Sequence, residues 1–260
     1  MKYKRQIAVI SDTHTGSDVA LWPEGFMFNQ RHIPAGDKQG VFNKYWDEFT
    51  DRAGCCDTVF HLADACEGLA KKEGGTGLMI SNLNAQIQAH LELIRPLCKK
   101  KKVLVWGGSR YHESFDYEIH NAIADDVQGR YMGVVSNLNV SGKKFHVKHA
   151  GMGGMQYRGA GLDKTNMNAL MAAGAGKVDM HDLTIEGHFH YYQRLDTANG
   201  AVLRVPCWKA WEPSRFFAKP YHRMQPDIGG CIVRIDTYDK IDIEPIIFPL
   251  PHIADEWVAA

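Results

Sequence analysis

The chain lacks an excess of charge of either sign, with 30 Lys and Arg against 30 Asp and Glu in 260 residues. A sequence-independent nucleic-acid coat would need a large basic surplus, and an acidic solvating tail would need the opposite, so both classes are excluded. Long apolar runs are missing too. The segment 7–10 is too short for a signal-peptide core, and no stretch of 18 apolar residues follows it. We therefore expect a cytoplasmic protein that does not enter a membrane.

No CxxC pair occurs among the six cysteines, which argues against a structural zinc module. The cysteines are irregularly spaced in a chain long enough to need no disulfide staples, so reduced thiols are expected. The sequence contains no internal repeat and no low-complexity linker. Its 45% hydrophobic and 23% charged residues are typical of a folded protein, and we expect residues 1–260 to form a single domain.

Short apolar runs rich in β-branched residues alternate with helical patterns, which predicts an α/β layered fold. The runs are 7–10, 58–62, 103–106, 145–147 and 183–185, and helical spacing marks 42–53 and 78–97. Ser141-Gly142 predicts a hairpin turn, so part of the sheet should be antiparallel. The last strands, at 201–205, 230–235 and 241–247, are expected to complete a second sheet.

Each of the five runs leads into an aspartate or a histidine. In chain order these are Asp12 with His14, Asp64, His112, His149, and His188 with His190. Ligands of open α/β sheets bind beyond the carboxyl ends of the strands, so these side chains should converge. On an extended segment the i, i+2 pairs would also point the same way.

Imidazole and carboxylate ligands together favour Mn, Fe, Zn or Ni over Mg alone, and Asp64 could bridge two ions. Two such ions can activate a water while they hold the oxygens of a phosphoryl group. The residues therefore predict metal-assisted hydrolysis.

In this order the elements resemble the signature of the calcineurin-like metallophosphoesterases: D-x-H, G-D-x-x-[DE], G-N-H-[DE], a lone His and G-H-x-H. The resemblance runs from Asp12 to His190. It implies a four-layer αββα sandwich of two mixed β-sheets flanked by helices. It also implies a centre of two divalent ions, with Mn²⁺ expected and Zn²⁺, Fe²⁺ or Ni²⁺ as alternatives.

The resemblance assigns one ion to Asp12, His14, Asp64 and His190, and the other to Asp64, His149 and His188. His112 matches the family histidine that protonates the leaving group or steadies the phosphoryl oxygens. His146 lies near His149, but strand alternation places the two on opposite faces and favours His149 as the ligand.

Two positions depart from the signature. Ala63 replaces the glycine before Asp64, and Glu67, three residues after it, is expected to hydrogen-bond nearby without binding metal. Ser109 stands where the family has Asn, and His112 follows in a loop two residues longer. The second ion is therefore expected to be held less tightly, or to take a water as its missing ligand.

Several other residues have two interpretations. Three loop residues would contact a phosphate or would simply be exposed to solvent: Arg110, Tyr157 and Arg158. The aromatics of 206–211, with Phe216 and Phe217, would stack bases or would pack in the core. The lysines of 99–102 are expected to be solvated at the C-terminal end of the preceding helix, where the helix dipole favours positive charge. His61 is expected to support the site or the core, and the remaining histidines to be structural or superficial: His32, His90, His120, His181, His222 and His252.

The sequence thus predicts a metal-dependent phosphoesterase, with a phosphodiesterase acting on a nucleotide or nucleic acid as the leading hypothesis. A phosphomonoesterase or protein phosphatase is the alternative within this class. A non-catalytic scaffold that keeps the fold is a second alternative. A metal-dependent amide hydrolase is disfavoured, because such enzymes usually carry HxH on the first strand, where this chain has DxH. The expected partner is the phosphate-ester substrate, with a nucleotide or nucleic acid as candidates, and the sequence does not indicate which proteins bind the chain.

Overall fold

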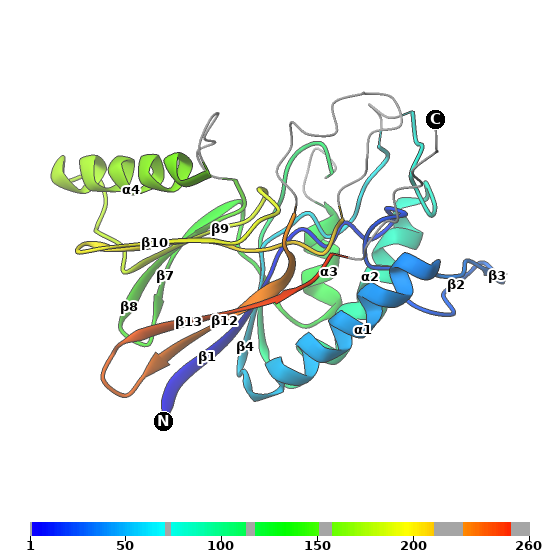
Figure 1. The fold of residues 1–260 in the computed structure, drawn as a ribbon, viewed down its shortest axis with the longest axis horizontal. Coiled ribbons are helices and arrows are strands. Elements are labelled where there is room, and N and C mark those ends of the chain that lie inside the picture. Colours follow the sequence, from blue (N-terminus) through cyan, green and yellow to red (C-terminus); the bar gives the residue numbers. More distant parts are fainter. Residues whose placement is uncertain (1, 71–73, 113–117, 151–157, 211–225, 251–260) are drawn as a thin grey trace, which may run out of the picture.

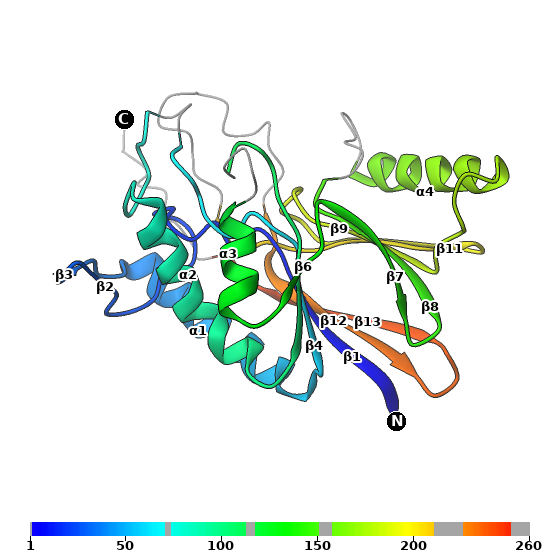
Figure 2. The same ribbon diagram turned by 180° about the vertical axis from the view of Figure 1, so that it is seen from behind.

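The computed structural model describes residues 2–70, 74–112, 118–150, 158–210 and 226–250. Two mixed sheets face one another, and helices cover the outer side of each (Figures 1 and 2). The predicted four-layer αββα sandwich is confirmed. All six cysteines are free thiols, and no helix in the described part is long and apolar enough to cross a membrane.

The first sheet has the order β13-β12-β1-β4-β5-β6. Its strands are β1 (Tyr3–Ile10), β4 (Thr58–His61), β5 (Lys102–Val105), β6 (Arg130–Tyr131), β12 (Ile228–Asp236) and β13 (Ile241–Phe248). The four central and edge strands β1, β4, β5 and β6 are parallel, whereas β12 and β13 run antiparallel to their neighbours. A parallel strand covered on both faces is apolar throughout, and the end of β1 from Ile7 to Ile10 is fully buried.

The second sheet has the order β10-β11-β9-β8-β7. Its strands are β7 (Val135–Val140), β8 (Lys143–Lys148), β9 (Leu183–Glu186), β10 (Gln193–Thr197) and β11 (Gly200–Arg204). The predicted hairpin joins β7 to β8: Ser141 and Gly142 both have positive φ, 52° and 92°, as a two-residue hairpin turn requires.

The expectation that all three C-terminal strands complete the second sheet was wrong for two of them. Only β11 joins that sheet, whereas β12 and β13 extend the first sheet beside β1. β12 is apolar on both faces and therefore needs a helix layer on one side and a sheet on the other. Gly230 allows this placement, because a Cβ there would lie 2.7 Å from the Phe49 ring of the covering helix.

Three helices pack on the first sheet: α1 (Asp37–Arg52), α2 (Leu83–Cys98) and α3 (Glu118–Asp126). α1 buries Phe42, Trp46 and Phe49 at helical spacing. α2 begins five residues later than predicted, because the Asn82 side chain caps it by accepting the Ala85 N–H at 3.0 Å. α4 (Arg158–Gly174) lies over the second sheet (Figure 1).

Short elements complete the described fold. A two-stranded ribbon pairs β2 (Met27–Phe28) with β3 (Arg31–His32), and a short 3₁₀ turn, η1 (Ala53–Cys55), follows α1. Trp208 is buried against Trp46 and Phe49, so the core interpretation holds for this aromatic. The other aromatics of that prediction, Trp211, Phe216 and Phe217, lie outside the described residues.

The layer between the sheets is apolar. Alternate residues of β1, such as Ile7 and Val9, face the second sheet, while Ala8 and Ile10 face the helices. The second sheet supplies Phe145, Val147, Leu183, Ile185 and Leu203 to the same layer. This packing fixes the two sheets so that the carboxyl ends of β1, β4, β5, β8 and β9 meet at one edge.

Candidate metal centre

All seven residues predicted from the motifs lie at this edge, and the structure brings them together. Three sets of ligand atoms each lie within 4.8 Å of one another: Asp12, His14 and His190; His14, Asp64 and His112; and Asp64, His149 and His188. Two of these sets follow the predicted division, with Asp64 at the junction. The third draws His112 close to two of the predicted ligands.

The backbone that presents these ligands is left-handed, not extended as the i, i+2 argument assumed. The φ angles are 52° at Asp12, 46° at His14, 44° at Asp64, 75° at His188 and 61° at His190. Non-glycine residues rarely adopt this conformation unless their surroundings impose it, and it concentrates at functional sites.

Backbone hydrogen bonds between the strand-end loops hold these residues in the left-handed conformation. The His14 N–H donates to the Asp64 carbonyl at 2.9 Å, and the Asp12 N–H donates to the Ala63 carbonyl at 3.1 Å. The Asp227 N–H donates to the carbonyl of His190 at 2.8 Å. The loops after β1, β4 and β9 are thus fastened independently of any bound group.

Asp12 is fully buried, and its two carboxylate oxygens differ. Oδ2 accepts the His188 N–H at 2.8 Å and the Ser11 hydroxyl. Oδ1 has no hydrogen-bond donor within the described part of the chain, and it lies 3.2 Å from Nε2 of His190 and 3.7 Å from Nε2 of His14. Burial would raise the pKa of Asp12, yet His149 and His190 hold it well below its usual range. An ionised oxygen facing imidazole nitrogens is an environment that a divalent cation fits.

Asp64 is held from two sides. Its Oδ2 lies 3.0 Å from Nε2 of His149, and its Oδ1 accepts the Ser109 N–H at 2.8 Å. Burial opposes ionisation, but His149 lowers the pKa of Asp64 far below its usual range. Burial lowers the pKa of His149, but the carboxylates of Asp64 and Asp12 raise it, to about 9. His149 and Asp64 thus each favour the charged form of the other.

His149 is also oriented by the backbone, because its Nδ1 lies 2.8 Å from the Leu62 carbonyl. A carbonyl only accepts, so Nδ1 carries the proton and Nε2 turns toward Asp64. Such an outer hydrogen bond is typical of metal-binding histidines. His146 lies elsewhere, stacked on His181 with ring centroids 4.7 Å apart.

Ser109 occupies the position next to Asp64 where the family has its amide. The Ser109 hydroxyl lies 3.2 Å from Oδ2 and 3.4 Å from Oδ1 of Asp64, so it donates to this carboxylate. The preceding Gly108 passes so close that a Cβ there would lie 2.0 Å from Asp64 Oδ1. This loop therefore orients Asp64, and the set of Asp64, His149 and His188 has no amide ligand from it.

The contact at Gly108 gives a test. Gly108→Ala is expected to displace the Asp64 carboxylate and to weaken divalent-metal binding by about 10-fold or more, as loss of ligand orientation does. Equilibrium dialysis with Mn²⁺ would measure this loss. Gly40→Ala in α1, where a Cβ would meet nothing within 4 Å, is the matched control and should bind like the unmodified protein. Equal binding by both variants would contradict the role given to Gly108.

Glu67 contacts both His14 and Lys209, which is distant in the sequence. Its Oε2 lies 3.0 Å from Nδ1 of His14, and its two oxygens accept from Nζ of Lys209 at 2.7 and 2.8 Å. Burial raises the pKa of Glu67, but His14 and Lys209 bring it to about 2. Glu67 thus hydrogen-bonds beside the site, and it belongs to none of the three ligand sets among the described residues.

His112 faces the same set from the loop after β5. Its Nδ1 donates to the Glu67 carbonyl at 2.7 Å, which leaves Nε2 for the site, and its ring centroid lies 4.4 Å from that of His14. Burial and then the neighbouring His14 lower the pKa of His112 to about 4. The free imidazole is therefore neutral at pH 7.

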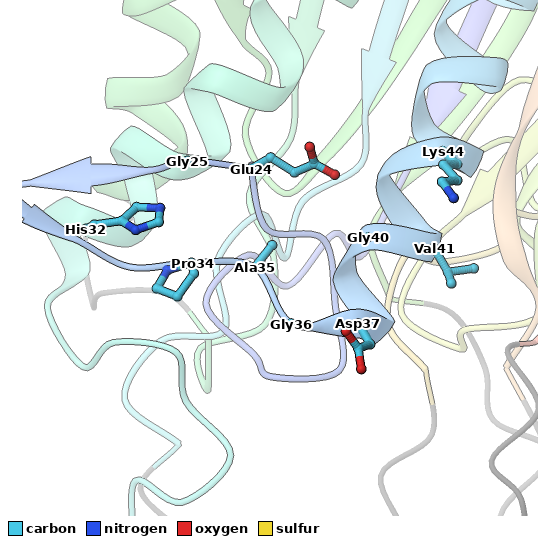
Figure 3. Close-up of a pocket in the computed structure, with 10 residues that line it drawn as sticks. All are labelled: Glu24, Gly25, His32, Pro34, Ala35, Gly36, Asp37, Gly40, Val41 and Lys44. Carbon is cyan, nitrogen blue, oxygen red and sulfur yellow. The ribbon is translucent and has the colours of Figure 1, made fainter.

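The two predicted phosphate-binding arginines lie on different segments. Arg110 is exposed in the loop between Ser109 and His112, and Arg158 is the first residue of α4. Tyr157 lies outside the described residues. A separate surface hollow between the β2–β3 ribbon and α1 is lined by Glu24, His32, Asp37 and Lys44 among others, and includes none of the predicted site residues (Figure 3).

Sequence reasoning missed two features of this edge. Lys209 lies in the segment 206–211, where only the aromatics suggested a role, although it pairs with Glu67 across 142 positions of the chain. The buried histidines beneath the site, His61, His90 and His120, were treated one by one, although they lie together: Nε2 of His61 is 2.9 Å from Nε2 of His90. No local sequence signal marks either contact.

No family model and no curated protein sequence matches the chain. Solved structures do match. An archaeal phosphodiesterase is 14% identical with a TM-score of 0.44, covering 94% of this chain and 99% of its own. Vps29 of Chaetomium thermophilum is 10% identical with a TM-score of 0.45, covering 97% and 100%. A predicted phosphoesterase of Streptococcus pneumoniae is 14% identical with a TM-score of 0.41, covering 94% and 93%.

These structures are similar to the chain in fold, and the site geometry described above stands independently of them. Two mixed sheets lie between helix layers, and the motif residues meet at one edge in three sets, two of which follow the predicted division. This two-sheet architecture agrees with the sandwich that the motif resemblance implies.

Proposed function

We propose that the protein is a metal-dependent phosphoesterase with a centre for two divalent ions. Asp12, His14, Asp64 and His190 would hold one ion, and Asp64, His149 and His188 the other. The observation that carries the proposal is that the three ligand sets meet at one edge of the sheets. One of them includes the buried Asp12 Oδ1, which faces imidazole nitrogens and accepts no hydrogen bond from the described residues. We take Mn²⁺ as the first ion to test, with Zn²⁺, Fe²⁺ and Ni²⁺ as alternatives.

Divalent ions bound here would supply the Lewis acidity and water activation that phosphate-ester hydrolysis needs. The chain's own residues prepare the site. Buried Asp12 and Asp64 stay ionised, and Glu67 and the Leu62 carbonyl fix the ring orientation of His14 and His149. The strained loops hold these ligands in place before anything binds.

His112 is the proposed general acid. Its Nδ1 is engaged by the Glu67 carbonyl, so only Nε2 is available to a substrate. Burial keeps the free ring neutral, and a phosphate placed beside it would favour the protonated form, which can give a proton to the leaving oxygen. Arg110 and Arg158 are proposed as phosphate contacts.

A phosphodiester of a nucleotide or nucleic acid is the proposed substrate class, and a phosphomonoester is the alternative. Neutral overall charge is compatible with either, because bound ions would place positive charge only where the phosphate lies.

The test compares hydrolysis of bis-p-nitrophenyl phosphate and p-nitrophenyl phosphate with Mn²⁺ and with EDTA. We expect Mn²⁺-dependent hydrolysis, with the diester preferred, and loss of activity in His14→Ala but not in His32→Ala, which changes an exposed histidine. Preference for the monoester would overturn the diesterase proposal. Metal-loaded protein that hydrolyses no phosphate ester would overturn the enzyme proposal and favour a scaffold that retains the fold.

A further inference from the structure

A row of charged side chains crosses the second sheet just behind the metal centre. Lys148, Glu186 and Arg204 lie opposite one another on β8, β9 and β11. Their neighbours Val147, Ile185 and Leu203 face the inter-sheet core, so the row lies on the face that α4 covers. Lys148 directly precedes His149, and Glu186 lies two residues before His188.

The row is buried and hydrogen-bonded. Glu186 and Arg204 are both 0% exposed, and Arg204 Nε donates to Glu186 Oε2 at 3.1 Å. The other carboxylate oxygen accepts from the Thr165 hydroxyl of α4 at 2.8 Å and lies 3.2 Å from Lys148 Nζ. A buried ion pair adds little stability over an apolar pair of similar volume, because desolvation offsets the attraction. Its presence at this place therefore points to orientation of its neighbours.

Those neighbours belong to the loop that carries His188 and His190. The guanidinium carbon of Arg204 lies 3.8 Å from the ring centroid of Phe189, and Nη1 donates to the Tyr191 hydroxyl at 2.8 Å. In this loop the two aromatics alternate with the two histidines. Arg204 therefore contacts the residue that follows each of these two histidines.

We propose that Arg204 is a positioning residue of the metal centre. It holds Phe189 and Tyr191, and thereby keeps His188 and His190 in their left-handed conformations, φ 75° and 61°, with their rings at the site. Glu186, fixed by Lys148 and Thr165, keeps the guanidinium in place. This inference rests on the proposed function in one respect, that the two histidines bind metal.

Arg204→Lys tests it, because lysine keeps the charge but loses the planar fork that both stacks and donates. Equilibrium dialysis with Co²⁺ gives the affinity, and the visible spectrum of the Co²⁺-loaded protein reports coordination geometry. We expect affinity to fall about 10-fold, the lower end of the effect of losing an outer partner, together with a changed spectrum. Tyr191→Phe, which removes only the hydroxyl, should lose affinity in the same direction by a smaller factor.

Arg234→Lys is the matched control. Arg234 also pairs with carboxylates, at 2.6 Å from Glu244, and lies 5.5 Å from the Tyr3 ring, but it belongs to β12. The Arg234→Lys substitution should leave the Co²⁺ affinity and the visible spectrum unchanged. If the Arg204→Lys variant does not fold, the Co²⁺ affinity and spectrum of the Tyr191→Phe variant decide whether Arg204 has a positioning role. Unchanged affinity and spectrum in the folded variants would overturn the positioning role alone, whereas no Co²⁺ binding by the unmodified protein would overturn the proposed metal centre as well.

Discussion

Asp64→Asn is expected to abolish tight binding of two divalent ions. Asp64 belongs to two of the three ligand sets, one with His149 and His188 and one with His14 and His112. An amide keeps the shape of the side chain but carries no charge, and it leaves the His149 imidazolium without its partner at 3.0 Å. We expect Mn²⁺ affinity to fall by more than the roughly 100-fold upper effect of losing an outer partner. Dialysis followed by elemental analysis would count the ions retained.

Two further variants make this result specific. Asp57→Asn changes a carboxylate that pairs with Arg5 at 2.8 Å, away from the site, and should retain metal. His112→Ala should lose most turnover but keep both ions if His112 is the acid. Metal loss in His112→Ala equal to that in Asp64→Asn would show that His112 is a ligand, and two retained ions in Asp64→Asn would contradict the bridging assignment.

The positions of the candidate ligands were predictable because their chemistry is local to each strand end. Asp12, Asp64 and His149 each follow a short apolar run, and parallel strands bring such ends to one edge. The same alternation predicted an α/β layered fold, whereas the four-layer sandwich of two sheets was implied by the family resemblance. In both cases the signal lies in short segments of the chain, which the sequence shows directly.

Contacts between distant segments were not predictable in this way. Glu67 was singled out, but its partner Lys209 lies 142 positions away, and the loop that carries it could equally have packed elsewhere. The placement of β12 beside β1 depends on the space that Gly230 leaves for Phe49, which strand patterns do not record. Left-handed φ at Asp12 and His188 is likewise set by neighbouring loops, whereas the sequence suggested extended segments.

The buried histidines beneath the site should make the protein sensitive to acid. His61, His90 and His120 are each at most 1% exposed, and Nε2 of His61 lies 2.9 Å from Nε2 of His90. Nδ1 of His90 lies 3.1 Å from the Thr15 hydroxyl, in the loop that follows His14. Burial lowers the pKa of His61 to about 4 and the pKa values of His90 and His120 well below the ordinary 6.5.

The direction of the effect follows from these pKa values. An unfolded histidine takes up a proton as the pH falls through 6.5, whereas the folded, buried one stays neutral until much lower pH. The unfolded state therefore binds more protons, and the free energy of unfolding decreases as the pH falls from about 6.5 toward 4. Each such histidine contributes a slope of up to about 1.4 kcal/mol per pH unit in this interval.

His90→Gln isolates one of these contributions, because the charges at Asp12, Asp64 and His149 titrate in both proteins and cancel in the difference. Denaturant unfolding at pH 7, 6 and 5, with chelator present throughout, would give the free energy of unfolding at each pH. We expect the variant to be less stable at pH 7, since it loses a buried ring, but to lose about 1 kcal/mol less between pH 6 and pH 5. Parallel stability profiles would show that His90 is protonated in the folded protein. The ring would then carry charge directly behind the candidate metal centre, and the neutral packing of His61 against His90 would be the wrong description of this layer.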